Sequence, residues 1–326
     1  MLVQTLAKTA KVEEARLVQI SETASRRYKV YEIPKRTGGT RTIEHPSREV
    51  KAIQRWIVSA VFNRFPVHEC ATAYRKGCGI RENAERHQHS RYTDRFDFAN
   101  FFPSFTQERV ESFVRVGTDE LGIELTSDDV RFVGNIVCRN RRLTIGAPSS
   151  PAITNTMMFE FDRGMYQYCS ARELVYTRYA DDIFVSAYGP NMLYGIEDQI
   201  RQVKREITHI FLRINRRKTV HLSKKRVRRI TGVVITPEHK LSIGRERKRE
   251  IKSLIHRWLN NNLDAEKLDY MRGLVAFARD IEPSFEERLR TKYGERALDE
   301  ILRYPPLPIT DRVLVLRHID GRIARR

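Results

Sequence analysis

Two adjacent aspartates between two short runs of β-prone residues constrain this chain more than any other feature of its sequence. The runs are Leu174–Tyr179 and Ile183–Ala187, and Ala180, Asp181 and Asp182 separate them. This pattern predicts a β-hairpin with both carboxylates at its turn. Two like charges so close repel each other unless a cation lies between them, and carboxylates without Cys or His neighbours favour Mg²⁺. The hairpin is therefore a candidate metal site.

A third carboxylate, Asp97, lies near the end of another predicted strand, Tyr92–Phe98. If this strand pairs with the hairpin in one sheet, three carboxylates at adjacent strand ends can hold two Mg²⁺ ions about 4 Å apart. Such a pair of ions serves in-line displacement at phosphorus, because one activates a 3′-hydroxyl while the other binds a triphosphate. The residues thus predict nucleotidyl transfer with Asp97, Asp181 and Asp182 as catalytic metal ligands.

Positive charge is concentrated in one part of the chain. The 326 residues include 60 Lys or Arg and 41 Asp or Glu, which gives a formal net charge of +19. Residues 201–260 alone hold 19 Lys or Arg and only four Glu. A solvated surface usually mixes the two signs, so this excess predicts a polyanionic partner. Nucleic acid is favoured over an anionic membrane surface.

The sequence carries no sign of a membrane or secreted protein. No apolar run approaches the roughly 18–20 residues of a membrane span, and residues 1–12 lack the apolar core of a signal peptide. The four cysteines form no C-x-x-C pair, which argues against a disulfide scaffold. We therefore expect a cytoplasmic protein with no membrane partner.

Hydrophobic periodicity predicts an α+β chain that ends in helices. Tyr28–Ile33 and Thr40–His45 predict a hairpin with basic residues at its tip, and Ser47–Phe62 predicts a helix. Helical patterns dominate from Arg245, after a shift of composition near Thr236. We expect a helical N-terminal extension over 1–27, an α+β catalytic part over 28–236, a helical part over 237–303 and a basic tail over 304–326.

Capping and proline signals predict where several helices begin. Ser104 with Gln107 predicts a capped helix from Phe105, and Ser284 with Glu287 predicts another over Phe285–Tyr293. Ser149 and Ser150 precede another predicted helix, which has Pro151 in its first turn. Its apolar stripe consists of Ile153, Met157, Phe161 and Met165.

The neighbours of the three carboxylates form an ordered set of motifs. Phe96–Ser104, Gly146–Pro151, Tyr176–Asp182 and Asn215–Thr219 resemble, in this order, four palm motifs of reverse transcriptases. Two more strings are similar to the N-A-x-x-H and V-T-G elements of retron reverse transcriptases: Asn83–His87 and Ile230–Gly232. The resemblance covers about residues 28–295.

The resemblance implies a right-hand polymerase, with fingers, a palm built on an antiparallel sheet and an α-helical thumb. It also implies RNA-templated DNA synthesis from dNTPs with two Mg²⁺ ions, for which Mn²⁺ can substitute. The template is then a cognate structured non-coding RNA (msr-msd). Priming from a 2′-hydroxyl of that RNA gives branched msDNA, an RNA–DNA hybrid. A role in antiphage defence with an effector or toxin protein from the same operon is implied as well.

Individual roles follow from matching positions. The resemblance makes the backbone carbonyl of Phe98 a further metal ligand and Phe102 a steric gate against ribonucleotides. Lys35, Arg36 and Arg41 flank the finger-like hairpin turn, where cations suit a triphosphate. The remaining nucleotide contacts are Gly146, beside the base pair, and Lys218, near the phosphates. The residues expected to bind RNA or template–primer are Asn83, His87, Thr231, Gly232, Arg245, Lys248, Arg249 and Lys252.

Two other interpretations stay open. Another bacterial reverse transcriptase is possible, although a group II intron enzyme would usually be longer and a diversity-generating enzyme would normally carry Ser-Gln where Ile145 and Gly146 stand. The second is a catalytically silent palm that serves as an RNA-binding scaffold. All three carboxylates are present, which favours an enzyme.

Overall fold

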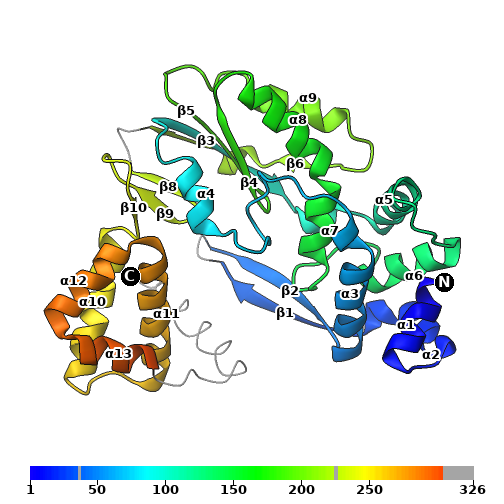
Figure 1. Cartoon of the computed structure of the whole chain (residues 1–326), viewed down its shortest axis with the longest axis horizontal. Helices are drawn as coiled ribbons and strands as arrows, with labels where there is room; N and C mark the ends of the chain where they lie inside the picture. Colours follow the sequence, from blue (N-terminus) through cyan, green and yellow to red (C-terminus); the bar gives the residue numbers. More distant parts are fainter. Residues whose placement is uncertain (36–37, 224–226, 304–326) are drawn as a thin grey trace. The chain divides into compact units, whose positions relative to one another are not determined.

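The computed structural model describes residues 1–35, 38–223 and 227–303, so Arg36 and the predicted basic tail over 304–326 lie outside the described residues. The chain divides into two compact units (Figure 1). The first unit comprises Met1–Ile33, Arg41–Gly77 and Ser90–His221, and the second comprises Pro34–Thr40, Cys78–His89 and the chain from Leu222. The predicted functional borders at 28, 237 and 304 stay predictions.

A five-stranded antiparallel sheet forms the centre of the first unit, in the order β4-β5-β3-β6, and β7 also pairs with β3. Its strands are β3 (Tyr92–Ala99), β4 (Val175–Tyr179), β5 (Asp182–Ala187), β6 (Arg213–Ile214) and β7 (Val220–Ser223). The register places Asp182 opposite Tyr179 on one side and opposite Asp97 on the other. The predicted hairpin and its pairing with the strand of Asp97 are both confirmed.

Helices cover this sheet because strand and helix residues share one apolar core. The helices that contribute buried residues to this core include α7 (Ser150–Met157), α8 (Phe159–Ser170) and α9 (Ile196–Arg205). Helix α8 packs against β4 and against α9 (Figure 1). The predicted stripe of four apolar residues is buried, but the helix is interrupted at Met158, so it forms two helices rather than one.

The rest of the first unit is a hairpin with helices around it. The hairpin strands are β1 (Tyr28–Pro34) and β2 (Thr40–Pro46). The helices are α1 (Leu2–Ala10), α2 (Glu14–Glu22), α3 (Arg48–Ala60), α5 (Gln107–Glu120) and α6 (Ser127–Val137), with short 3₁₀ turns η1 (Ala24–Arg26), η2 (Phe62–Arg64), η3 (Phe102–Ser104) and η4 (Arg216–Lys218). The cap of α3 is the Ser47 side chain, which accepts from the backbone N–H of Val50.

The predicted start of α5 at Phe105, with Ser104 as its cap, is wrong by two residues, because the helix begins at Gln107. Thr106 stands at the N-cap position, and the Ser104 hydroxyl instead donates to the backbone carbonyl of Asn100 at 2.9 Å. Phe102–Ser104 form a separate 3₁₀ turn before the helix. A serine that bonds backwards to a preceding carbonyl closes a turn, so it no longer serves as a helix cap.

The second unit joins a small sheet to four helices. The sheet has the order β10-β9-β8, with β8 (Arg228–Ile230), β9 (Val233–Ile235) and β10 (Leu241–Ser242), and the short helix α4 (Ile80–Arg86) packs on all three strands. The helices that follow are α10 (Arg245–Leu259), α11 (Ala265–Ile281), α12 (Pro283–Tyr293) and α13 (Glu295–Arg303). Glu282, not Ser284, precedes α12, and no side chain caps it. Within the described ranges, no helix is apolar over enough of its length to pass through a lipid bilayer.

Candidate active site

The sheet brings the three predicted catalytic aspartates to one end of two strands. Asp97 lies on β3 directly opposite Asp182, the first residue of β5. Asp181 stands in the turn before Asp182, and its backbone carbonyl accepts a hydrogen bond from the N–H of Phe98 at 2.9 Å. Because these positions are fixed by backbone pairing, the carboxylates do not depend on a mobile loop for their spacing.

Two cationic side chains accompany these carboxylates. The Lys218 ammonium group lies 2.9 Å from Oδ2 of Asp97, and Nε of Arg95 lies 3.2 Å from Oδ1 of Asp182. The Asp97 side chain is only 4% exposed, while that of Lys218 is 52% exposed. Lys218 therefore links a buried carboxylate to the solvent.

The site still carries an excess of negative charge. Burial raises the pKa of Asp182 to about 6; Arg95 opposes this rise, while the negative charges of Asp181 and Asp97 add to it. Burial, with repulsion from Asp97, also raises the pKa of Asp181, against the effect of Lys218 and Arg41. These raised pKa values mean that burial and mutual repulsion destabilise the ionised carboxylates. A bound cation would remove this destabilisation.

The oxygen atoms suit a hard divalent cation. Oδ1 of Asp97 is buried and has no hydrogen-bond partner, so this oxygen is free to coordinate a metal ion. Among the described residues, no three His, Cys, Asp or Glu side chains already lie in a metal-binding arrangement. The fit to Mg²⁺ thus rests on the all-oxygen donor set and on the unpartnered oxygen of Asp97. The Phe98 carbonyl as a ligand stays a prediction.

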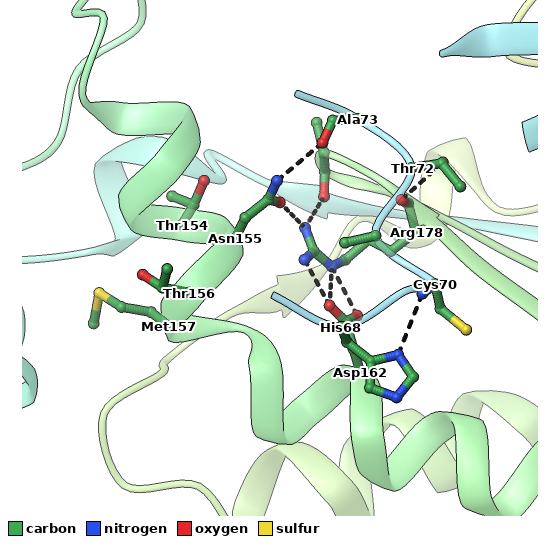
Figure 2. Close-up of polar contacts among 12 residues, drawn as sticks. His68, Cys70, Thr72, Ala73, Thr154, Asn155, Thr156, Met157, Asp162 and Arg178 are labelled. Carbon is green, nitrogen blue, oxygen red and sulfur yellow. Dashed lines mark hydrogen bonds and ion pairs between the residues drawn. The ribbon is translucent and has the colours of Figure 1, made fainter. Parts of the chain in front are cut away.

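A buried arginine that the sequence analysis missed lies beneath the turn that holds Asp181. The Arg178 side chain is fully buried and forms a two-pronged ion pair with Asp162 of α8, with Nη2–Oδ2 at 2.7 Å and Nε–Oδ1 at 2.8 Å (Figure 2). Its Nη1 also donates to the backbone carbonyl of Ala180 at 3.2 Å. Ala180 has a φ of 56°, which is unusual for a residue with a side chain. The guanidinium therefore holds the strained residue that precedes Asp181.

The same network reaches two other segments of the first unit, α7 and residues 72–73, and a second residue of β4. Asn155 of α7 accepts from Arg178 at 3.2 Å and donates to the carbonyl of Ala73 at 2.9 Å (Figure 2). The Tyr176 hydroxyl donates to Asp162 at 2.7 Å. The backbone N–H of Thr72 donates to the Arg178 carbonyl at 2.8 Å. In the sequence, Arg178 and Asp162 each stand as a charged residue inside an apolar stretch. This pattern does not show that the two form a pair.

The predicted nucleotide contacts occupy several elements. Phe102 lies in η3, partly buried, with its ring edge-on to Phe101 at a centroid distance of 5.4 Å. Arg41 is exposed on β2 and close enough to lower the pKa of Asp181. Lys35 follows β1, and its N–H donates to the carbonyl of Gly39 at 2.9 Å. Their contacts with a nucleotide stay predictions.

Gly146 approaches the finger hairpin very closely. Its φ is +113°, and a Cβ placed on it would lie 2.9 Å from the carbonyl oxygen of Glu44 and 3.0 Å from Cγ2 of Ile43. The N–H of Glu44 donates to the Ile145 carbonyl at 2.8 Å. The glycine thus lets the second palm motif pack against β2, a contact that the predicted approach to a base pair did not include.

Gly146→Ala is expected to lower the free energy of unfolding by ~2–4 kcal/mol, because the new methyl group meets backbone atoms and the positive φ is itself unfavourable. Urea unfolding measures this loss. Gly122→Ala is the matched control, since its φ is +65° but nothing lies within 4 Å of the added Cβ. The control should lose only ~1–2 kcal/mol. Equal losses in both variants would remove any special role for the contact with β2.

The two elements typical of retron enzymes meet inside the second unit. Nδ2 of Asn83 lies 3.5 Å from Oγ1 of Thr231, whose hydroxyl donates to the Ile80 carbonyl at 3.2 Å. Gly232 accepts from Arg247 at 3.3 Å through its carbonyl. His87 is fully buried, and burial first of all lowers its pKa to about 3, so it is neutral at physiological pH. Their expected role in RNA binding stays a prediction, and for the buried Asn83 and His87 it would act through the fold.

The cations predicted on the first thumb helix differ in their surroundings. Arg245, Arg249 and Lys252 are exposed on α10. Lys248 is half-buried and forms an ion pair with Glu282 at 2.6 Å, so part of its charge is already compensated. Three apolar residues of the opposite helix face, Ile251, Leu254 and Ile255, are buried, whereas Leu259 is 45% exposed.

Comparisons with known proteins identify the family. The family model described as reverse transcriptase (RNA-dependent DNA polymerase) matches residues 33–235. The retron Ec83 reverse transcriptase of Escherichia coli is 39% identical over 286 residues, which cover 85% of this chain and 90% of that protein. The retron Ec73 reverse transcriptase of the same species is 32% identical over 277 residues, or 81% of this chain and 86% of that protein.

A solved structure shares the fold at low sequence identity. The telomerase of Candida albicans in complex with a TWJ fragment of telomeric RNA aligns with a TM-score of 0.50 and 14% identity, over 95% of this chain and 61% of that chain. The predicted right-hand polymerase of the α+β class is thereby confirmed. With a family model over more than half of its length and two relatives above 30% identity, the chain belongs to the retron reverse transcriptases, which are RNA-directed DNA polymerases.

Proposed function

We propose that this enzyme copies a cognate structured non-coding RNA into DNA with Mg²⁺ held by Asp97, Asp181 and Asp182. The observation that carries the proposal is the pairing of β3 with β5, which puts two of these carboxylates opposite each other and the third in the adjoining turn. Bound Mg²⁺ supplies activation of the attacking hydroxyl and stabilisation of the leaving pyrophosphate. Dependence on Mg²⁺, which Mn²⁺ can replace, is part of the proposal.

The chain's own residues have distinct tasks in this reaction. Lys218, bonded to Asp97 and half exposed, provides a positive charge at the mouth of the site for the nucleotide phosphates. Arg95 steadies Asp182. Arg178 fixes the turn through the Ala180 carbonyl, so the positions of Asp181 and Asp182 are set before substrate binds.

The finer aspects of the proposal rest on the family. They are priming from a 2′-hydroxyl of the RNA, a branched msDNA product, an effector protein from the same operon, and antiphage defence in the cytoplasm. The resemblance of Asn83–His87 and Ile230–Gly232 to retron elements supports them. The family membership supports them further, at 39% identity to one retron enzyme.

Primer extension tests the polymerase, and the native RNA tests the priming. The purified enzyme should extend a primer on an RNA template with dNTPs and Mg²⁺, and EDTA should stop it. The enzyme co-purified with its operon RNA should make labelled DNA without any added primer. This DNA should migrate faster in a denaturing gel after RNase digestion, because attached RNA is removed. No DNA from either reaction would favour the silent scaffold instead.

Phe102→Ala is expected to raise the use of ribonucleotides relative to deoxynucleotides by roughly 10–100-fold, as expected when a pocket loses a steric contact. The ratio of kcat/KM for each dNTP and its rNTP measures this change. The kcat/KM for dNTPs should fall far less than the ratio shifts. An unchanged ratio would show that Phe102 is a core residue like its neighbour Phe101, which is buried.

A further inference from the structure

A strongly basic groove opens on the first unit between α9 and β6. We call it the α9–β6 groove. Its cavity of about 530 Å³ is lined by six cationic side chains, Arg109, Arg201, Lys204, Arg205, Arg213 and Arg216. A second cavity of about 350 Å³ shares Arg109 and Arg213 with it, and Arg142 adds a further cation there. The two cavities form one basic tract.

Most of this charge is not compensated by acidic side chains. Arg201 pairs with Glu197 and with Asp198, the latter at 2.9 Å, and Arg216 pairs with Glu197 at 3.0 Å. Arg205 and Arg213 form no ion pair with an acidic side chain in the described part of the chain. Burial, together with Arg201, Arg205 and Arg213, lowers the pKa of Lys204, which shows that the cations repel one another. An anion with several charges would relieve this repulsion.

An exposed aromatic ring stands among these cations. Phe211 lines both cavities and is 61% exposed. The guanidinium of Arg109 lies over its ring at 5.2 Å from the centroid, and Nη1 of Arg109 is buried without a hydrogen-bond partner. A large apolar ring left in water beside spare cations suits a ligand that offers both a flat base and phosphates. Proteins that bind single strands combine the same two features.

The groove adjoins the catalytic end of the sheet. Arg213 on β6 pairs with Ala99, two residues beyond Asp97 on β3. The N–H of Asn215 donates to the Asp97 carbonyl at 2.7 Å. The second cavity reaches Asn100 and Ser104, in the loop that follows the first palm motif. A strand lying in the groove would thus run to the carboxylates.

We propose that the α9–β6 groove binds a single-stranded segment of RNA, with phosphates on Arg205 and Arg213 and a base stacked on Phe211. The inference rests on the proposed function, because it gives the enzyme's RNA a binding surface on the palm in addition to the predicted thumb contacts. A duplex fits less well, since its bases are already stacked on each other and cannot cover the ring.

Binding of a fluorescent 12-nucleotide single-stranded RNA to the full chain tests the proposal. Arg205→Ala/Arg213→Ala should weaken binding at least 10-fold and reduce the slope of log K against log salt by about 1.4, as expected for two lost phosphate contacts. Phe211→Leu should weaken binding roughly 5–100-fold with an unchanged slope, because stacking involves no counterions. A 12-base-pair RNA duplex should respond to Phe211→Leu by less than 2-fold.

The matched control is Arg55→Ala/Arg131→Ala, which removes two exposed arginines from α3 and α6. It should change the affinity by less than 2-fold, and equal losses in both pairs would overturn the proposal. The proposal would also be overturned if Arg205→Ala/Arg213→Ala abolished binding to anionic phosphatidylserine vesicles but left RNA binding unchanged.

Primer extension by the wild type separates the groove proposal from the proposed function. If the wild type makes DNA but all variants bind RNA normally, only the groove is refuted; if the groove binds RNA but no DNA forms, only the proposed function fails.

Discussion

Changing Asp181 and Asp182 together to Asn is expected to slow DNA synthesis by more than about 100-fold, without lowering the free energy of unfolding at pH 8. Groups that merely support metal ligands cost about 10–100-fold when removed, so the loss of two direct ligands should exceed that range. Single-turnover primer extension on an RNA template measures the rate. Urea unfolding in EDTA measures the stability of the same two proteins.

The stability half of this prediction follows from the raised pKa of the pair. In the unfolded chain these carboxyls titrate near 3.8, whereas burial brings the pKa of Asp182 to about 6 in the fold. A raised pKa means that the group favours folding below pH 3.8, and that this contribution is lost as the pH rises to about 6. The wild type therefore loses stability across this window, and the Asn variant should not.

The comparison is sharpest as a difference between pH 5 and pH 8. The double variant should gain relative to the wild type by ~1 kcal/mol on going to the higher pH, a modest figure because only about one pH unit lies between pH 5 and the Asp182 pKa of about 6. Asp119→Asn/Glu120→Gln removes two exposed charges from the end of α5 and should show no such difference. A variant that retains DNA synthesis would contradict the assignment of the metal ligands.

Local patterns were sufficient for the parts of the fold where neighbours in sequence are neighbours in space. The hairpin of Asp181 and Asp182 follows from two β-prone runs around a short turn, and α10 begins at Arg245, where helical patterns are predicted to begin. The pairing of the Asp97 strand with that hairpin could only be assumed from the sequence. The strand register shows it, with Asp97 opposite Asp182.

Features that depend on distant residues were beyond sequence reasoning. The ion pair of Arg178 with Asp162 joins a strand to a helix, and Asn83 meets Thr231 across 148 positions. Arg178 stands inside the motif Tyr176–Asp182 and Asp162 in no motif, and neither position in the sequence identifies the other residue as its partner. The close contact of Gly146 with Glu44 also joins distant residues. The reason for a glycine at this position is visible only once β2 is packed against it.

Arg178→Met is expected to lower the free energy of unfolding of the first unit by about 3–5 kcal/mol, the usual cost of removing one partner of a buried ion pair. The cause is Asp162, which would stay fully buried with no cation beside it. The protein carries two tryptophans, Trp56 and Trp258. Urea unfolding in a Trp258→Phe background leaves Trp56 of α3 as the reporter for this unit.

The double variant Arg178→Met/Asp162→Leu separates the stability of the pair from its effect on the catalytic turn. With both charges removed, most of the lost stability should return, because apolar residues of similar size often replace a buried pair without penalty. DNA synthesis should not return to the same extent, since no side chain then donates to the Ala180 carbonyl that Arg178 holds at 3.2 Å. A double variant as active as the wild type, at a temperature where both are folded, would mean that β4 and β5 hold Asp181 and Asp182 in place by themselves.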